Sequence, residues 1–153
     1  MTLYEFLLFM HVTAAVVWVG GATMHLALIL LARRIGSDED RVKVVDWDER
    51  LGVVLYLPSS LVVLGAGIWL VLEGNWDWDQ TWIVLGLVIF ALTFVVGVLF
   101  YIPQGKKLEA AIKAGGHGSA EAVARAGMIA SMIWFDLALL LAAIFVMTTK
   151  PGL

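Results

Sequence analysis

Two histidines and a tryptophan, His11, Trp18 and His25, follow one another at intervals of seven in the first apolar segment of the chain. Seven helical residues return a side chain to within about 20° of its starting direction, so the three side chains line one face of a helix. Small residues share that face: Ala14, Ala15, Gly21 and Ala22. Neutral imidazole is a ligand of haem iron and of copper, and small residues beside an indole leave room for a flat macrocycle.

Three interpretations of the two histidines follow from this pattern. The first is haem ligation, and the second is a structural role, in which each imidazole forms a hydrogen bond across a helix bundle. The third is copper binding. His11 and His25 are about 21 Å apart along a helix, so they cannot bind one iron together. Sixth ligands for two separate sites could come from methionines of the last apolar segment: Met128, Met132 and Met147.

The composition predicts the elements that must position these groups. Of the 153 residues, 61% are hydrophobic and 15% are charged, and the mean hydropathy is +0.93. A spanning helix needs about 20 apolar residues. We therefore expect an all-α, integral membrane, antiparallel four-transmembrane-helix bundle. Its spans cover about residues 3–32, 51–72, 81–103 and 126–149.

The first span is not expected to be a cleaved signal, because it lacks a basic n-region and is longer than an h-region. We see no internal repeat and expect a single transmembrane domain over residues 1–153. Two loops, 33–50 and 104–125, separate the first span from the second and the third from the fourth. Within these loops we expect a short amphipathic helix from Asp38 to Arg50 and a helical continuation beyond Pro103. We also expect Ser37 with Asp40 to cap one helix and Ser119 to cap the last.

Charge and cysteine content exclude several functions. The net charge of −3 disfavours a nucleic-acid partner, and the absence of cysteine excludes disulfides, Fe–S clusters and thiolate zinc sites. The 33–50 and 104–125 loops hold nine of the ten Lys and Arg residues. By the positive-inside rule we expect both loops to be cytoplasmic and both termini to be extracytoplasmic in a multi-pass protein of the cell membrane.

Three further polar residues lie within the expected spans. Asp136 falls near the middle of the fourth span, where an isolated charge is costly, so we expect it to face the bundle interior. Ser59 and Ser60 follow Pro58 in the second span. Proline there leaves a backbone carbonyl without its donor and bends the helix, and the serines can bond that carbonyl or reach across helices.

The pattern H-x6-W-x-G-G, which begins at His11 in a first span ending in two arginines, resembles the first helix of a group of small bacterial membrane proteins. The group includes an uncharacterised family of predicted integral membrane proteins, the membrane domain of the copper-resistance D family, and the HemJ-type, haem-associated protoporphyrinogen oxidase. In the last, a first-helix histidine is understood to ligate haem b, and the resemblance gives that role to His11. That family also uses a lysine within a later span, which this chain lacks.

We therefore expect a small haem-b-binding membrane protein of redox or haem-handling type, with electron transfer as one possible role. His11 is the first candidate ligand and His25 the second, while Trp18 and Gly21 shape the groove. One alternative is a non-catalytic accessory subunit of a membrane complex. The partners that we expect are the lipid bilayer and either further copies of the chain, in a homo-oligomer, or a larger membrane complex. Another is a copper or small-solute permease with a polar path joining His11, Asp136 and His25. Whether the chain is an enzyme stays open.

Overall fold

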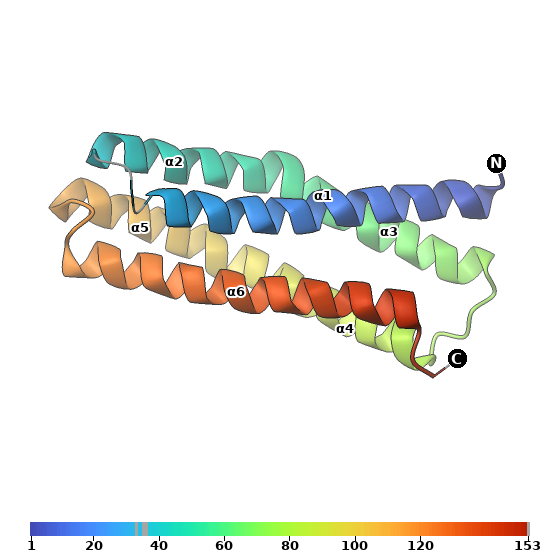
Figure 1. Ribbon diagram of the computed structural model, residues 1–153. Helices are drawn as coiled ribbons and strands as arrows, with labels where there is room; N and C mark the ends of the chain where they lie inside the picture. Colours follow the sequence, from blue (N-terminus) through green and yellow to red (C-terminus); the bar gives the residue numbers. More distant parts are fainter. Residues whose placement is uncertain (33, 35–36, 153) are drawn as a thin grey trace.

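The computed structural model describes residues 1–153 except 33, 35–36 and 153, and the described chain is an elongated bundle of helices without strands (Figure 1). Two long helices, α1 and α6, run beside two composite helices that each contain a π-helical turn, η1 or η2. The elements are α1 (Leu3–Ala32), α2 (Asp38–Leu51), η1 (Gly52–Tyr56), α3 (Leu57–Glu73), α4 (Thr81–Val96), η2 (Gly97–Tyr101), α5 (Ile102–Gly115) and α6 (Ala120–Thr149). The all-α prediction is confirmed.

Four of these helical stretches are long and apolar enough to cross a membrane: Leu3–Leu31, Gly52–Glu73, Thr81–Gly115 and Ala120–Thr149. They agree with the four predicted spans, and the last two extend further toward the 104–125 connection than expected. Parts of the 33–50 loop, residues 33 and 35–36, lie outside the described residues. The predicted amphipathic helix is present as α2, and it runs without interruption into the second span.

Side-chain caps fix two of the helix starts, as predicted. The Ser37 hydroxyl donates to Asp40 Oδ2 at 2.5 Å, and the Asp40 amide donates back to Ser37 Oγ at 3.2 Å. The hydrogen bond from Ser37 is the main reason that the pKa of the exposed Asp40 carboxyl is lowered. At α6, the Ala122 amide donates to Ser119 Oγ at 3.3 Å. Each cap satisfies an amide that the first helical turn leaves without a partner.

The two π-helical turns have similar sequences, a short internal repeat that the sequence analysis did not identify. Gly52–Tyr56 reads GVVLY and is followed by Leu-Pro, while Gly97–Tyr101 reads GVLFY and is followed by Ile-Pro. Proline lacks the amide hydrogen that an α-helix would donate four residues back, and a wider π turn is one way to accommodate this defect. The bend expected at Pro58 is therefore a π turn on its N-terminal side, and Pro103 has the same arrangement.

These turns mark the level at which the bundle changes from closed to open. On the side of α2 and α5, the helices form a ring in which α1 contacts α2, α2 contacts α5, α5 contacts α6, and α6 contacts α1. Beyond the turns, α1 still contacts α3 and α6, and α6 contacts α4, but α3 and α4 scarcely contact each other. Both termini lie at this open end, as does the 74–80 turn (Figure 1).

Two clusters of buried residues form the core, one at each end. The larger fills the closed end and includes Leu26, Leu108, Ile129 and Ile133. The smaller consists of Val71, Trp82, Ile83 and Val146 at the open end. The space between the smaller cluster and α1 holds the candidate site.

Candidate functional site

A cavity of about 740 Å³ lies at the open end of the bundle, enclosed by α1, α3, α4 and α6. Its wall is almost entirely apolar, and the polar side chains among its lining residues include His11, Thr23 and Lys150. The volume falls within the range typical of small-molecule and cofactor sites. The helices α3 and α4 both line the cavity but scarcely contact each other.

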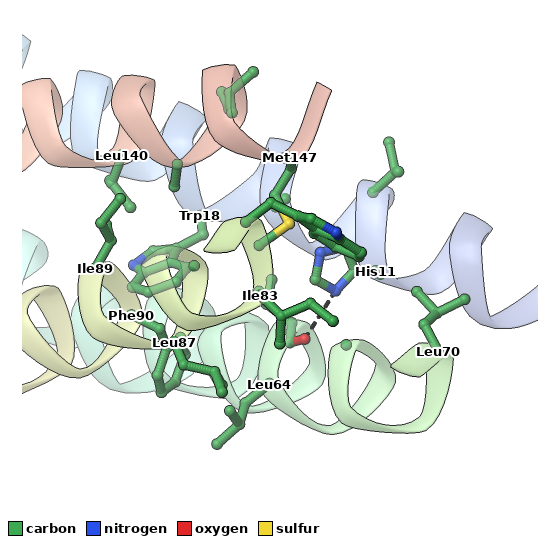
Figure 2. A pocket seen from close by; sticks show the side chains of 18 of the residues that line it. His11, Trp18, Leu64, Leu70, Ile83, Leu87, Ile89, Phe90, Leu140 and Met147 are labelled. Carbon is green, nitrogen blue, oxygen red and sulfur yellow. Dashed lines mark hydrogen bonds between the residues drawn. The ribbon is translucent and has the colours of Figure 1, made fainter. Parts of the chain in front are cut away.

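His11 contributes an imidazole with a fixed tautomer to this cavity. Its Nδ1 lies 2.9 Å from the carbonyl oxygen of Val63 on α3, and a carbonyl can only accept, so Nδ1–H donates (Figure 2). The lone pair is then on Nε2. Histidines that bind a metal through one ring nitrogen usually donate the other N–H in this way.

Gly67 makes room for the imidazole on α3. A Cβ at this position would lie 3.1 Å from His11 Cε1 and 3.2 Å from Nδ1, which is closer than side chains normally approach. Gly65, two residues earlier in the chain, has nothing within 4 Å of an added Cβ. The close approach of α3 to His11 therefore requires glycine at position 67 but not at position 65.

Trp18 forms an aromatic wall across the cavity with residues of α4. Its indole meets the Phe90 ring edge-on, with 5.5 Å between ring centroids, and Phe90 stacks on Phe94 at 5.8 Å. His11 and Trp18 thus line one cavity, as their spacing predicted (Figure 2).

Met147 reaches the same cavity from α6. Its terminal methyl occupies the position that a Cβ would take on Gly86 of α4, so the glycine admits the thioether between the helices. Figure 2 shows the Met147 sulfur and the His11 ring on the walls of one cavity. Of the three methionines considered from the sequence, Met128 and Met132 do not line it.

A cation, Lys150, lines the cavity just beyond the end of α6. Lys150 Nζ lies 4.5 Å from the centroid of Trp76 and 4.9 Å from that of Trp82, and the two indoles meet edge-on at 5.5 Å. All three side chains line the cavity. The sequence analysis did not identify this cluster, because Lys150 is far along the chain from the two tryptophans.

His25 and Gly21 lie outside the lining of this cavity. The His25 ring contacts Tyr101, with 5.3 Å between centroids. Gly21 lies under the ring of Tyr56, whose Cε1 and Cδ1 would overlap a Cβ placed there. The groove expected along one whole face of the first helix is therefore divided: His11, Ala15 and Trp18 line the cavity, whereas Gly21 and His25 lie beside the tyrosines that end the π turns.

The remaining polar candidates are buried within the bundle or bonded to their own helix. Asp136 is 8% exposed, as expected for a residue that faces the interior, and it does not line the cavity. The Ser59 hydroxyl donates to the Leu55 carbonyl at 2.7 Å, and Ser60 donates to Leu57 at 2.8 Å. Both serines thus bond carbonyls of their own helical stretch, and neither acceptor is the carbonyl of Val54, four residues before Pro58, that they were expected to bond.

Within the described part of the chain, no group of three or more His, Asp or Glu side chains gathers as a cation site would require. A copper or zinc centre built from such ligands has no candidate there. A macrocycle that brings four nitrogens of its own needs only one or two axial ligands from the protein, and His11 with Met147 could supply them.

A family model described as "Predicted integral membrane protein (DUF2269)" matches residues 5–151. No curated protein and no solved structure matches the chain. The family match supports the membrane part of the resemblance found in the sequence, and its description assigns no activity.

Proposed function

This chain belongs to the family of predicted integral membrane proteins, DUF2269, and we propose that it binds one haem b in the cavity between α1, α3, α4 and α6. The observation that carries the proposal is the bond from His11 Nδ1 to the Val63 carbonyl inside an apolar cavity of about 740 Å³. That bond leaves Nε2 as the ligand atom, and the apolar wall suits a flat hydrophobic ring.

The chain's own residues would hold the cofactor in three ways. His11 would supply a nitrogen ligand to the iron, and the thioether of Met147 is the candidate for a second ligand. Trp18 with Phe90 flanks the ring. Lys150, which lies over the rings of Trp76 and Trp82, would pair with the carboxylates of the macrocycle. Bound haem would supply one-electron redox chemistry, whose potential depends on the axial ligands and on burial.

The proposal places a single haem at His11. His25 does not line this cavity, so a second haem at His25 has no comparable support. The polar path of a permease would need to join His11 to Asp136, and the lining of the cavity does not include Asp136. These observations favour a cofactor-binding role over the permease alternative.

We also propose that the cavity faces the extracytoplasmic half of the cell membrane. The 33–50 and 104–125 connections carry nine of the ten basic residues, and the positive-inside rule assigns them to the cytoplasm. The opposite end, with both termini, the 74–80 turn and the cavity mouth, would then lie outside.

The test is an absorption spectrum of the full chain, purified in mild detergent after expression with supplemented haem precursor. We expect a Soret band, with α and β bands on reduction, that is lost in His11→Ala and kept in the matched loop variant His117→Ala. Met147→Leu should keep the haem and change the spectrum, because only the sixth ligand is removed. Wild-type protein that holds no haem, or a full spectrum in His11→Ala, would refute the proposal and leave the accessory-subunit alternative.

A further inference from the structure

A second group of polar side chains lies at the level of the two π turns, outside the cavity around His11. Asp136 of α6 is 8% exposed. Its Oδ1 is buried and has no hydrogen-bond partner among the residues that the structure describes. A buried acceptor without a partner is destabilising, and native structures keep few of them. A buried ionisable group without a hydrogen-bond partner inside a membrane is therefore taken first as a sign of a functional site.

His25 of α1 is the ionisable neighbour of Asp136. The two side chains interact electrostatically, and the His25 ring also contacts Tyr101 at 5.3 Å between centroids. Burial favours the neutral form of a carboxyl group, whereas a protonated imidazole beside it favours the carboxylate. The pair therefore brings two ionisable side chains together inside the bundle.

The two π turns deliver one tyrosine each to this region. Tyr56 ends η1 and packs over Gly21 of α1, and Tyr101 ends η2 and packs on His25, one helical turn further along α1. Both phenol oxygens are buried. Single π turns inside α-helices often occur at functional sites because they redirect a side chain. The two similar sequences therefore place one phenol ring on His25 and a second one helical turn away, over Gly21.

Among the described residues of α4, α5 and α6, no other charged side chain lies within a helical turn of this level along its own helix. The helix α4, which packs on α6, contains no charged residue. The charges of α5 begin at Lys106, more than a helical turn beyond Tyr101. On α6 itself, the nearest cation is Arg125, three turns away, which bonds Glu121 and Gln104.

We infer that Asp136 and His25, flanked by Tyr56 and Tyr101, form a proton-binding site inside the membrane. Asp136 accepts one proton as a carboxylate and returns it as a carboxylic acid, with His25 as the partner that exchanges the proton. No electron moves and no bond other than O–H or N–H forms or breaks. This site is independent of the proposed haem site, because it shares no residue with the cavity wall.

The experiment is infrared titration of the full chain in lipid nanodiscs between about pH 4 and about pH 10, a range that brackets ordinary carboxyl and imidazole values. We expect one protonated-carboxyl C=O band that disappears reversibly as the pH rises and shifts in D₂O. Asp136→Asn should lack it, and Glu73→Gln, which changes an exposed acid at the end of α3, should keep it. His25→Gln should move the midpoint by about one pH unit, as expected for coupled sites.

Two results would overturn the inference. A band that persists over the whole range, or fails to shift in D₂O, would make Asp136 a permanently protonated structural residue. A band that survives in Asp136→Asn would belong to another carboxyl. If Asp136→Asn does not fold, Asp136→Glu provides the same assignment, because the longer carboxyl should titrate with an altered C=O frequency. The titration can be done on protein without haem, so failure of the haem proposal would not change the behaviour expected of the carboxyl band.

Discussion

Replacement of Gly67 by alanine tests whether the position of the His11 ring sets the affinity for haem. The new Cβ would lie 3.1 Å from Cε1 and 3.2 Å from Nδ1, while carbon atoms normally pack at about 3.5–4.0 Å. The ring must therefore move by a few tenths of an ångström. That movement strains the 2.9 Å bond from Nδ1 to the Val63 carbonyl.

The size of the effect follows from the role of that bond. Loss of a group that orients a metal ligand typically costs about 10–100-fold in affinity, which corresponds to about 1.4–2.8 kcal/mol. We expect a reduction in this range for Gly67→Ala. Gly65→Ala is the matched control, because its Cβ meets nothing within 4 Å, and it should bind haem as the wild type does.

The assay is titration of haem-free protein in nanodiscs, followed through the Soret band, with the melting temperature of each variant measured in parallel. Equal affinities for the two variants would refute the reasoning, since the ring would then tolerate the displacement. Equal losses in both variants would show a general effect of alanine on α3 instead of a specific effect on His11.

Three more predictions test the fold and its orientation. A cysteine introduced at position 107 should resist impermeant thiol reagents applied to intact cells and react after permeabilisation; labelling from outside would reverse the proposed topology. Gly21→Ala should lower thermal stability by about 1–3 kcal/mol, because the Cβ overlaps the ring of Tyr56, whereas Gly20→Ala, with open space, should not; similar melting temperatures would contradict this packing. Ser119→Ala should cost about 0.5–2 kcal/mol in thermal unfolding through loss of the α6 cap, and an unchanged melting temperature would argue against that cap.

The sequence was sufficient to predict the spans and one half of the site. Long uncharged stretches specify membrane helices by length alone, and a spacing of seven placed His11 and Trp18 in one cavity. His25 has the same spacing but a different environment, because the π turns separate an open end from a closed one. That separation depends on contacts between helices, which the periodicity of one helix does not encode.

Other parts of the site needed the assembled structure for the same reason. The cluster at Lys150 forms only when the end of α6 meets the start of α4 and the preceding turn. The repeat that ends in Tyr56 and Tyr101 was visible in the sequence. Its structural meaning was not visible, because the sequence before a proline does not distinguish a π turn from an α turn without the packing of the neighbouring rings.

The cavity is apolar and lies among helices long and apolar enough to cross a membrane, so a hydrophobic ligand would reach it from the bilayer. A hydrophobic molecule partitions into the bilayer first, so the concentration that matters for occupancy is its mole fraction in lipid and not its level in water. Occupancy would then depend on membrane composition and on the amount of bilayer present, even at a fixed total amount of ligand. Lipid added as empty vesicles should therefore compete for the ligand as effectively as a binding protein would.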